Sequence, residues 1–175
     1  TKLMINIAPR YGKTELAVKR FIANGFALNP AAKFIHLSSS DELVLDNSLG
    51  IQDILNLPEF QNLFEARLKN SNVKKWYTKQ GGGLYAVSSS GQVTGFGAGV
   101  VDEEFTNEEK DTFDEFLDFY PNTGFGGALI IDDAIKPDDA LSDTIRNKVN
   151  FKFESTLRNR VNSRNTPIII IGHRL

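Results

Sequence analysis

The stretch from Ile5 to Glu15 constrains the fold more than any other part of the chain, because an apolar strand there runs into a loop and then into a helix. Gly12-Lys13-Thr14 lies at the predicted start of the helix, where free backbone N–H groups and the helix dipole favour an anion. In such a phosphate loop the lysine contacts the β- and γ-phosphates, and the threonine hydroxyl binds Mg²⁺. The pattern therefore predicts a nucleotide site that begins at Lys13 and Thr14.

The loop departs from the usual G-x-x-x-x-G-K-[ST] pattern at its first glycine, which is Ile7 here. Pro9 stiffens the turn in place of that glycine, and Arg10 puts a permanent cation inside it. A chance Gly-Lys-Thr on an amphipathic helix is the alternative. The strand-loop-helix context favours the nucleotide site, in which we expect Lys13 to be a solvent-facing cation whose partner is phosphate.

Length and composition indicate one globular domain. The 175 residues, 41% of them hydrophobic, are enough to bury a full core. The chain has no cysteine, which excludes disulfides and thiolate metal sites, and no apolar run approaches the roughly 20 residues of a membrane span. We expect a single domain over residues 1–175, cut from a longer protein, because the chain begins at the start of a predicted strand and stops directly after another.

The net charge of −2 conceals an uneven distribution. Residues 102–118 contain nine acids and one base, which leaves 13 acids and 19 bases in the rest of the chain. A basic body of this kind can face nucleic acid. An ordinary solvated surface beside an acidic insertion is the alternative, and charge alone favours it.

The first half of the chain alternates strands and helices. The pattern predicts strands at 2–8 and 33–37, and helices at 13–28, 42–57 and 58–68. Asn29-Pro30 ends the first helix, because a residue before proline is pushed out of the α region, and Pro58 starts the third. The resulting order begins βαβα.

The second half is more varied. It predicts short strands at 74–80, 84–88 and 92–96, an acidic insertion at about 100–126 with a helix at 108–119, a helix at 137–161, and a buried strand at 168–171. On the long helix, apolar residues recur every four positions from Leu141 to Leu157. Lys74, Lys75, Trp76 and Tyr77 mix basic and aromatic side chains as a nucleic-acid surface does, although an amphipathic strand is the commoner source of that pattern.

Residues 128–133 form the second half of the predicted site. Four apolar residues are followed by Asp132 and Asp133, which indicates a buried strand whose C-terminal end meets a charged site. We expect Asp132 to hold magnesium together with Thr14, and Asp133 to polarise the attacking water. Acid pairs at strand ends also occur as loop caps, but together with the phosphate loop this one predicts both halves of a Mg-ATP site at one sheet edge.

Four segments carry a family resemblance. In chain order they are Ala8-Pro9-Arg10-Tyr11-Gly12-Lys13-Thr14-Glu15, Thr94-Gly95-Phe96-Gly97-Ala98, Leu129-Ile130-Ile131-Asp132-Asp133-Ala134-Ile135-Lys136-Pro137 and Ile170-Ile171-Gly172-His173-Arg174-Leu175. This ordered set covers almost the whole chain and resembles the ATPase domain of the large terminase subunit of tailed bacteriophages.

The resemblance implies an α/β, three-layer phosphate-loop NTPase of the additional-strand, RecA-like type, with a mainly parallel sheet and Mg-ATP at its C-terminal edge. It implies a motor that hydrolyses ATP to pump double-stranded DNA into a procapsid in the host cytoplasm, without a membrane. The implied partners are the portal protein, the small terminase subunit and further copies of the chain in a homo-oligomeric ring.

By the same resemblance, residues of the loop and of a coupling motif contact ATP. The loop residues are Pro9, Arg10, Tyr11, Gly12, Lys13, Thr14 and Glu15. The coupling motif is Gly172-His173-Arg174, which would sense the γ-phosphate. The chain departs from the family where many relatives have Asp-Glu instead of Asp132-Asp133. The family's upstream adenine-binding segment and downstream nuclease domain do not lie in these residues.

An arginine at the γ-phosphate would stabilise the charge of the transition state. Arg10 is close enough to Gly12 to act in cis, whereas Arg158 and Arg160 lie at the end of a predicted helix. We expect Arg160 to act in trans, because a ring motor needs each site to sense its neighbour. The alternative is that Arg10 only orders the loop and that the other two are solvated helix-end cations.

Two other functions stay open on the sequence. One is a helicase-like or recombination ATPase that moves along nucleic acid without filling a capsid. The other is a nucleotide-binding regulatory domain that does not hydrolyse. Measured ATP turnover separates the motors from the regulator, and a downstream nuclease domain in the parent gene would favour the terminase.

Overall fold

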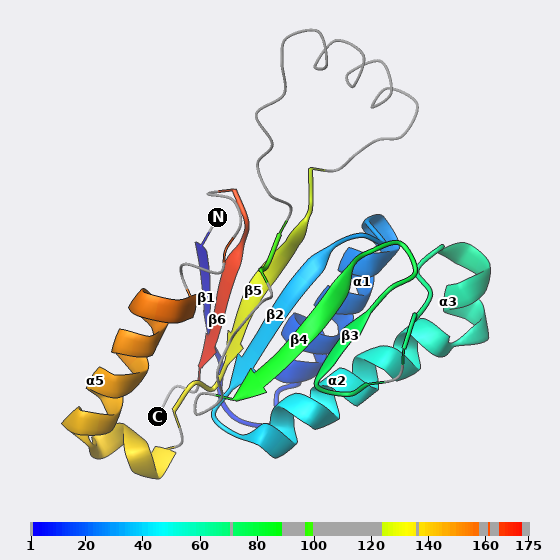
Figure 1. The fold of residues 1–175 in the computed structure, drawn as a ribbon. Helices are drawn as coiled ribbons and strands as arrows, with labels where there is room; N and C mark the ends of the chain where they lie inside the picture. Colours follow the sequence, from blue (N-terminus) through cyan, green and yellow to red (C-terminus); the bar gives the residue numbers. More distant parts are fainter. Residues whose placement is uncertain are drawn as a thin grey trace, which may run out of the picture.

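A mainly parallel sheet forms the centre of the molecule (Figure 1). The computed structural model describes residues 2–70, 72–88, 97–99, 124–135, 137–157, 161 and 165–172. In these residues the strands are β1 (Lys2–Asn6), β2 (Lys33–Ser38), β3 (Lys75–Tyr77), β4 (Gly83–Ser88), β5 (Gly127–Asp132) and β6 (Ile168–Gly172), in the spatial order β1-β6-β5-β2-β4-β3. All neighbouring pairs are parallel except β3 with β4.

The strand ends meet at one level of the sheet. β6 lies between β1 and β5, so that Ile171 pairs with Ile5 on one side and with Asp132 on the other. Asp132 in turn is level with Ser38 at the end of β2. Because parallel strands share their direction, the loops that follow β1, β2 and β5 emerge at the edge where β6 also ends, and α/β proteins bind ligands at this edge.

The first helix follows directly from the loop after β1. It runs without interruption through a segment of π geometry, η1 (Glu15–Arg20), into α1 (Phe21–Leu28). Asn29 ends it as predicted, with an extended backbone, while its side chain accepts from the Ala31 N–H and donates to the Phe125 carbonyl. The second helix, α2 (Asp41–Asn56), begins after Ser40, and α3 (Pro58–Leu63) follows it.

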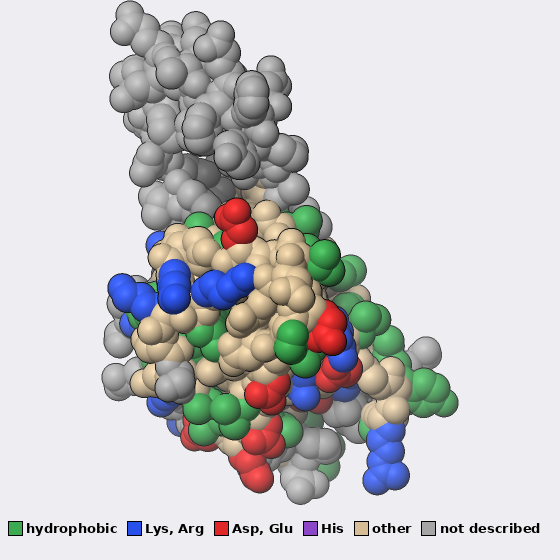
Figure 2. Space-filling model, turned by 90° about the vertical axis from the view of Figure 1, so that its right-hand side faces the viewer, with side chains coloured by type: hydrophobic (Ala, Val, Ile, Leu, Met, Phe, Trp, Pro, Cys, Tyr) green, Lys and Arg blue, Asp and Glu red, His purple; other side chains and the backbone are tan. Residues whose placement is uncertain are grey.

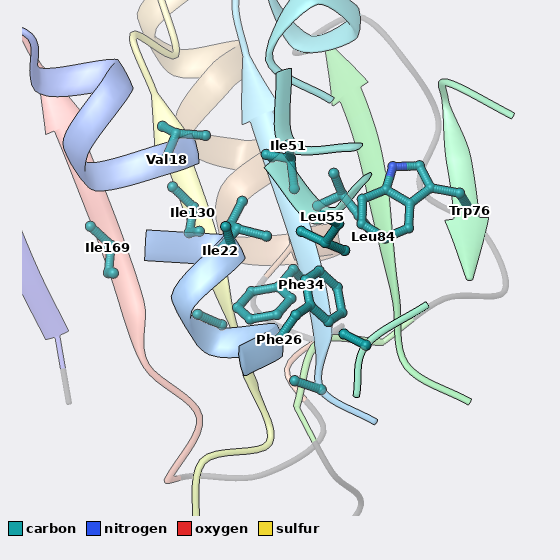
Figure 3. Packing of buried hydrophobic residues seen from close by; sticks show 14 of the residues in the cluster. Val18, Ile22, Phe26, Phe34, Ile51, Leu55, Trp76, Leu84, Ile130 and Ile169 are labelled. Carbon is teal, nitrogen blue, oxygen red and sulfur yellow. The ribbon is translucent and has the colours of Figure 1, made fainter. Parts of the chain in front are cut away.

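The first helix and α2 cover one face of the sheet with a continuous apolar core (Figure 3). Phe26 is fully buried, and its ring centroid lies 4.9 Å from that of Phe34 and 5.3 Å from that of Trp76. The other labelled members of this core are Val18, Ile22, Ile51, Leu55, Leu84, Ile130 and Ile169. Each such side chain stabilises the fold by about 1.5–3 kcal/mol on burial, so this face anchors the helix that follows the predicted phosphate loop to the sheet.

A second apolar cluster lies on the opposite face of the sheet. Alternate residues of the same strands form it, among them Ile35, Leu37, Leu129 and Ile131. Phe153, from the segment after α5 (Asp143–Lys152), packs against it. The two clusters explain why β4, β5 and all of β2 after Lys33 are buried, because both faces of these strands are covered.

The helix predicted at 58–68 is wrong in its second half, since α3 ends at Leu63. Phe64 is extended, and the guanidinium of Arg67 donates to the carbonyls of Gln61, Phe64 and Ala66 at the end of the helix. Leu68 then pairs with Thr78 in an antiparallel bridge. A strand partner therefore replaces the helical hydrogen bonds there.

The single helix predicted at 137–161 is also wrong. The chain forms a 3₁₀ turn, η2 (Pro137–Leu141), then α5, then a π-helical segment, η3 (Phe153–Leu157). Ser142 causes the break, because it is extended and its hydroxyl accepts from the Ile145 N–H as an N-cap. Leu141 is 89% exposed and so does not belong to the predicted apolar face.

The strand predicted at 84–88 is confirmed by β4, and its glycine turn to β3 is confirmed by their antiparallel pairing. The predictions for 92–96 and 108–119, and nearly all of the acidic insertion, lie outside the described residues. No helix among the described residues is long and apolar enough to cross a membrane.

Candidate functional site

A pocket of about 300 Å³ opens at the edge of the sheet where the parallel strands end. It is surrounded by the loop after β1, the end of β5, the end of β2 and the first half of α2. The lining residues are Arg10, Gly12, Lys13, Thr14, Glu15, Ser38, Leu43, Asn47, Asp132 and Asp133. The predicted loop and the predicted acid pair thus line the same pocket.

The loop after β1 turns sharply just before the first helix begins. Arg10 and Gly12 both have positive φ, of 68° and 71°. Glycine adopts this conformation without strain, whereas for Arg10 it is uncommon. The Gly12 carbonyl accepts from the Leu16 N–H at 2.9 Å, which makes it the first hydrogen bond of the helix. The N–H groups of the first helical turn therefore lie beside the pocket, where they favour an anion.

Thr14 and Asp132 meet across the pocket. The Thr14 hydroxyl donates to Oδ2 of Asp132 at 2.7 Å, and Asp132 is only 4% exposed. A hydroxyl and a carboxylate are the hard oxygen ligands that Mg²⁺ takes, with substrate phosphates and water completing its shell. These two residues therefore fit the implied metal. Among the described residues, no cluster of three or more His, Asp or Glu side chains is placed to hold a metal ion.

Lys13 contacts the second acid of the pair. Its ammonium lies 3.0 Å from Oδ1 and 3.1 Å from Oδ2 of Asp133, and Lys13 is 7% exposed. The expectation of a solvent-facing lysine whose partner is phosphate is thus wrong for this structure. The reason is register, because β5 and β1 end at the same level and bring the two side chains together.

The backbone of Asp133 is held by the strands on both sides. Its N–H donates to the Ile171 carbonyl and its carbonyl accepts from the Ser39 N–H, each at 3.0 Å. Asp133 has a φ of 46°, in the left-handed region that a non-glycine residue rarely adopts. These hydrogen bonds hold the strained residue in place and aim its carboxylate at Lys13.

Three residues that line the pocket were not predicted from the sequence as site residues: Ser38, Leu43 and Asn47. Asn47 is 5% exposed, and its amide donates to Nε2 of the buried His36 at 3.1 Å. Burial lowers the pKa of His36 to about 4, because the imidazolium would lose its hydration. His36 thus stays neutral at pH 7, and its ring fixes the amide of Asn47 at the pocket wall. The only signal in the sequence was a polar residue on a helix that follows a strand end.

No protein-family model and no curated protein matches the chain. Among solved structures, the crystal structure of the HK97 bacteriophage large terminase matches with a TM-score of 0.53 and 16% sequence identity. The match covers 98% of this chain and 29% of that protein. The chain has the fold of part of a large terminase. The predicted family resemblance is confirmed at the level of the fold, and the chain spans less than a third of the terminase it matches.

Not all of the residues predicted to contact ATP line the pocket of this terminase fold. Pro9 and Tyr11 lie in the same turn, and Tyr11 is 77% exposed. Glu15 does line the pocket, but its carboxylate accepts a hydrogen bond from Arg20 and forms an ion pair with Lys19. The hydrogen bond from Arg20 does most to hold the pKa of Glu15 below its usual range.

The coupling motif is described only in part. Gly172 ends β6, level with Asn6, and its carbonyl accepts from the Ile7 N–H at 3.4 Å, which places it beside the start of the phosphate loop. His173 and Arg174 lie outside the described residues, as do Arg158 and Arg160.

Proposed function

We propose that the chain is the Mg-ATP-hydrolysing motor domain of a viral terminase large subunit, which drives double-stranded DNA into a procapsid in the host cytoplasm. The observation that carries the proposal is the hydrogen bond between Thr14 and Asp132, with Lys13 and Asp133 beside it. The position of β6 between the loop strand and the acid strand supports the additional-strand, RecA-like class of NTPase. The portal protein, the small terminase subunit and a ring of copies belong to the proposal through the resemblance.

Five side chains of the pocket have a role in this proposal. Lys13 and the N–H groups of the helix start bind the phosphates of ATP, and Arg10 adds a further cation at the rim. Thr14 and Asp132 would hold Mg²⁺, which neutralises charge on the phosphate oxygens when bound. Asp133 orients and polarises the attacking water.

In this proposal, the contact between Lys13 and Asp133 makes ATP binding precede the step in which Asp133 polarises water. A γ-phosphate competes with Asp133 for the Lys13 ammonium, because both are anions within reach of one cation. When Lys13 moves to the phosphate, the Asp133 carboxylate becomes available to a water molecule. ATP binding and the readiness of the catalytic carboxylate are then coupled through one ion pair.

The test is Mg-dependent ATP turnover by the purified chain, measured as phosphate release with and without EDTA. We expect turnover in the parent and in Lys148→Ala, a matched control that removes an exposed lysine on α5, and none in Lys13→Ala. Tight ATP binding without turnover would favour the regulatory alternative. Equal turnover in Lys13→Ala would end the proposal.

A further inference from the structure

The region around β3 concentrates positive charge. Between Ala66 and Gln80 the sequence contains five bases and no acid; the bases are Arg67, Lys69, Lys74, Lys75 and Lys79. The guanidinium of Arg67 donates hydrogen bonds to backbone carbonyls of residues 61, 64 and 66, at and just after the end of α3. Lys69 and Lys79 form no ion pair with any side chain that the structure describes. The charges of Lys69 and Lys79 are therefore not offset by an ion pair within the described part of the chain.

The pairing of residues 67–69 with 77–79 separates this region into two faces. Leu68 and Thr78 are bridge partners, so their side chains share a face, and Trp76 lies on it as well. That face is the inner one: Trp76 is fully buried, with its indole N–H donating to Ser48, and Thr78 is 1% exposed. Because side chains alternate along a strand, those of Lys75, Tyr77 and Lys79 lie on the opposite face.

Three lysines meet on that opposite face, around Tyr77. Backbone hydrogen bonds put Lys69 directly across from Tyr77, while Lys75 and Lys79 precede and follow it by two positions. Directly opposed side chains in such a ladder lie about 4.5–5.5 Å apart at Cβ. We call Lys69, Lys75 and Lys79 the lysine face. Lys75 and Lys79 are diagonal neighbours of Lys69, about 7–8 Å away, a spacing at which long side chains still reach one another, so a bound anion would be attracted by all three charges.

The aromatic side chain at the centre of the lysine face is not free to stack on a base. Tyr77 packs against the second apolar cluster, and the Lys75 ammonium lies 5.8 Å from its ring centroid and 5.6 Å from that of Tyr85. Binding of single strands uses aromatic rings that bases can reach. The exposed groups that the lysine face offers are the ammonium groups of Lys69 and Lys79, which suit the phosphate backbone of a duplex.

We propose that the lysine face binds the phosphate backbone of double-stranded DNA, a partner whose choice rests on the proposed function. Figure 2, which views the molecule from the β3 side, shows several Lys and Arg side chains in a row on this side of the molecule. The surface is distinct from the ATP pocket, whose lining includes no residue of β3. Lysines also protect sheet edges from aggregation, and that role predicts no effect on DNA affinity.

The experiment measures duplex DNA affinity of the full 175-residue chain against salt concentration, by fluorescence anisotropy with two labelled duplexes of unrelated sequence. The variant is Lys69→Ala/Lys79→Ala, and the control is Lys2→Ala/Lys148→Ala, which removes the same charge from exposed positions on β1 and α5. We expect the slope of log K against log salt to become shallower by about two in the variant alone, for both sequences. Lys69→Arg/Lys79→Arg should keep the parent slope.

Circular dichroism shows whether each variant is folded, and ATP turnover is measured in parallel. Equal slopes for variant and control, or no DNA binding by the folded parent chain, would overturn the assignment. Tighter binding of single-stranded than duplex DNA through the same lysines would also overturn it. Loss of DNA binding with normal ATP turnover supports the lysine face, whereas salt-dependent binding through these lysines in a chain without turnover removes only the proposed function.

Discussion

The ammonium of Lys13 lies 3.0 Å from Asp133, so its removal changes both the pocket and the stability of the chain. We expect Lys13→Ala to abolish ATP binding or turnover. The side chain of Asp133 is 20% exposed and regains some hydration, so the free energy of unfolding should fall by only about 1–3 kcal/mol. Urea unfolding and phosphate release measure the two effects. Unchanged hydrolysis by a folded Lys13→Ala chain would contradict the role of Lys13.

Substitutions of Asp132 and Asp133 should have different effects on the binding and the hydrolysis of ATP. Asp132→Ala should weaken Mg-dependent nucleotide binding, because it removes the carboxylate that would hold Mg²⁺ beside the Thr14 hydroxyl, 2.7 Å away. Asp133→Asn should bind ATP but hydrolyse it about 10²- to 10⁴-fold more slowly, since an amide cannot accept a proton from water. Asp53→Asn, an exposed acid on α2, is the control. If Asp133→Asn kept most of its turnover, another carboxylate would have to be catalytic.

His36 predicts a pH dependence of stability. Its pKa is about 4 in the folded chain and about 6.5 when unfolded, so the unfolded state binds the extra proton first. Stability is therefore full above pH 6.5 and declines as the pH falls towards 4, by roughly 3 kcal/mol from this group. Urea unfolding at pH 7 and pH 4.5 should show a smaller difference in His36→Gln than in the parent. Equal differences would contradict the neutral, buried state of His36.

At the scale of elements, β5 depends on a glycine at its first residue. Gly127 has a φ of 125°, and a Cβ there would lie 1.9 Å from the Lys33 carbonyl oxygen, on the neighbouring strand β2. Gly81, with a φ of 88° and no atom within 4 Å of its would-be Cβ, is the matched control. We expect Gly81→Ala to cost about 1–2 kcal/mol and Gly127→Ala clearly more. Thermal unfolding of both variants tests this, and equal costs would mean that β2 and β5 are not paired as described.

The elements that the sequence mispredicted share a physical cause. The helix after Pro58 ends early and the helix after Pro137 begins late, because in each case a side chain satisfies backbone groups at the boundary that a longer helix would have used. Arg67 does this at the end of α3, and Ser142 does it at the start of α5. The spacing of apolar residues does not predict such caps, because it indicates which face of a helix is apolar and not where backbone hydrogen bonds change partners.

At the scale of the whole molecule, the arginine that completes the site remains a prediction. Arg10 lines the pocket in cis, whereas Arg160 lies outside the described residues. If Arg160 acts in trans, specific ATPase activity should rise with protein concentration, because a neighbour has to supply it. Arg160→Ala chains, nearly inactive alone, should regain turnover when mixed with Lys13→Ala chains. Concentration-independent activity without rescue on mixing would return the role to Arg10.

We also expect the chain to lack nuclease activity. Its described carboxylates do not form a second group of acids suited to two metal ions. Incubation of plasmid DNA with the purified chain in Mg²⁺ or Mn²⁺ measures this directly. Cleavage that copurifies with the folded chain and persists in Lys13→Ala would contradict the expectation.

The sequence by itself determined the local parts of the site. The loop at residues 9–14, the helix that starts at Lys13 and the acids that end β5 could all be predicted, because each depends on neighbours in the chain. Turn residues, helix starts and the end of an apolar run are short-range signals. The α/β class followed from the alternation of those signals.

Only the tertiary structure decided which of these parts touch. Thr14 and Asp132 are 118 positions apart, and Lys13 and Asp133 are 120 apart, so their contacts depend on the register of β1, β6 and β5. The hydrogen bond of Asn47 to His36 and the lysine face depend in the same way on which strand lies beside which. Strand order is set by burial of both sheet faces at once, a property of the whole chain that no local pattern contains.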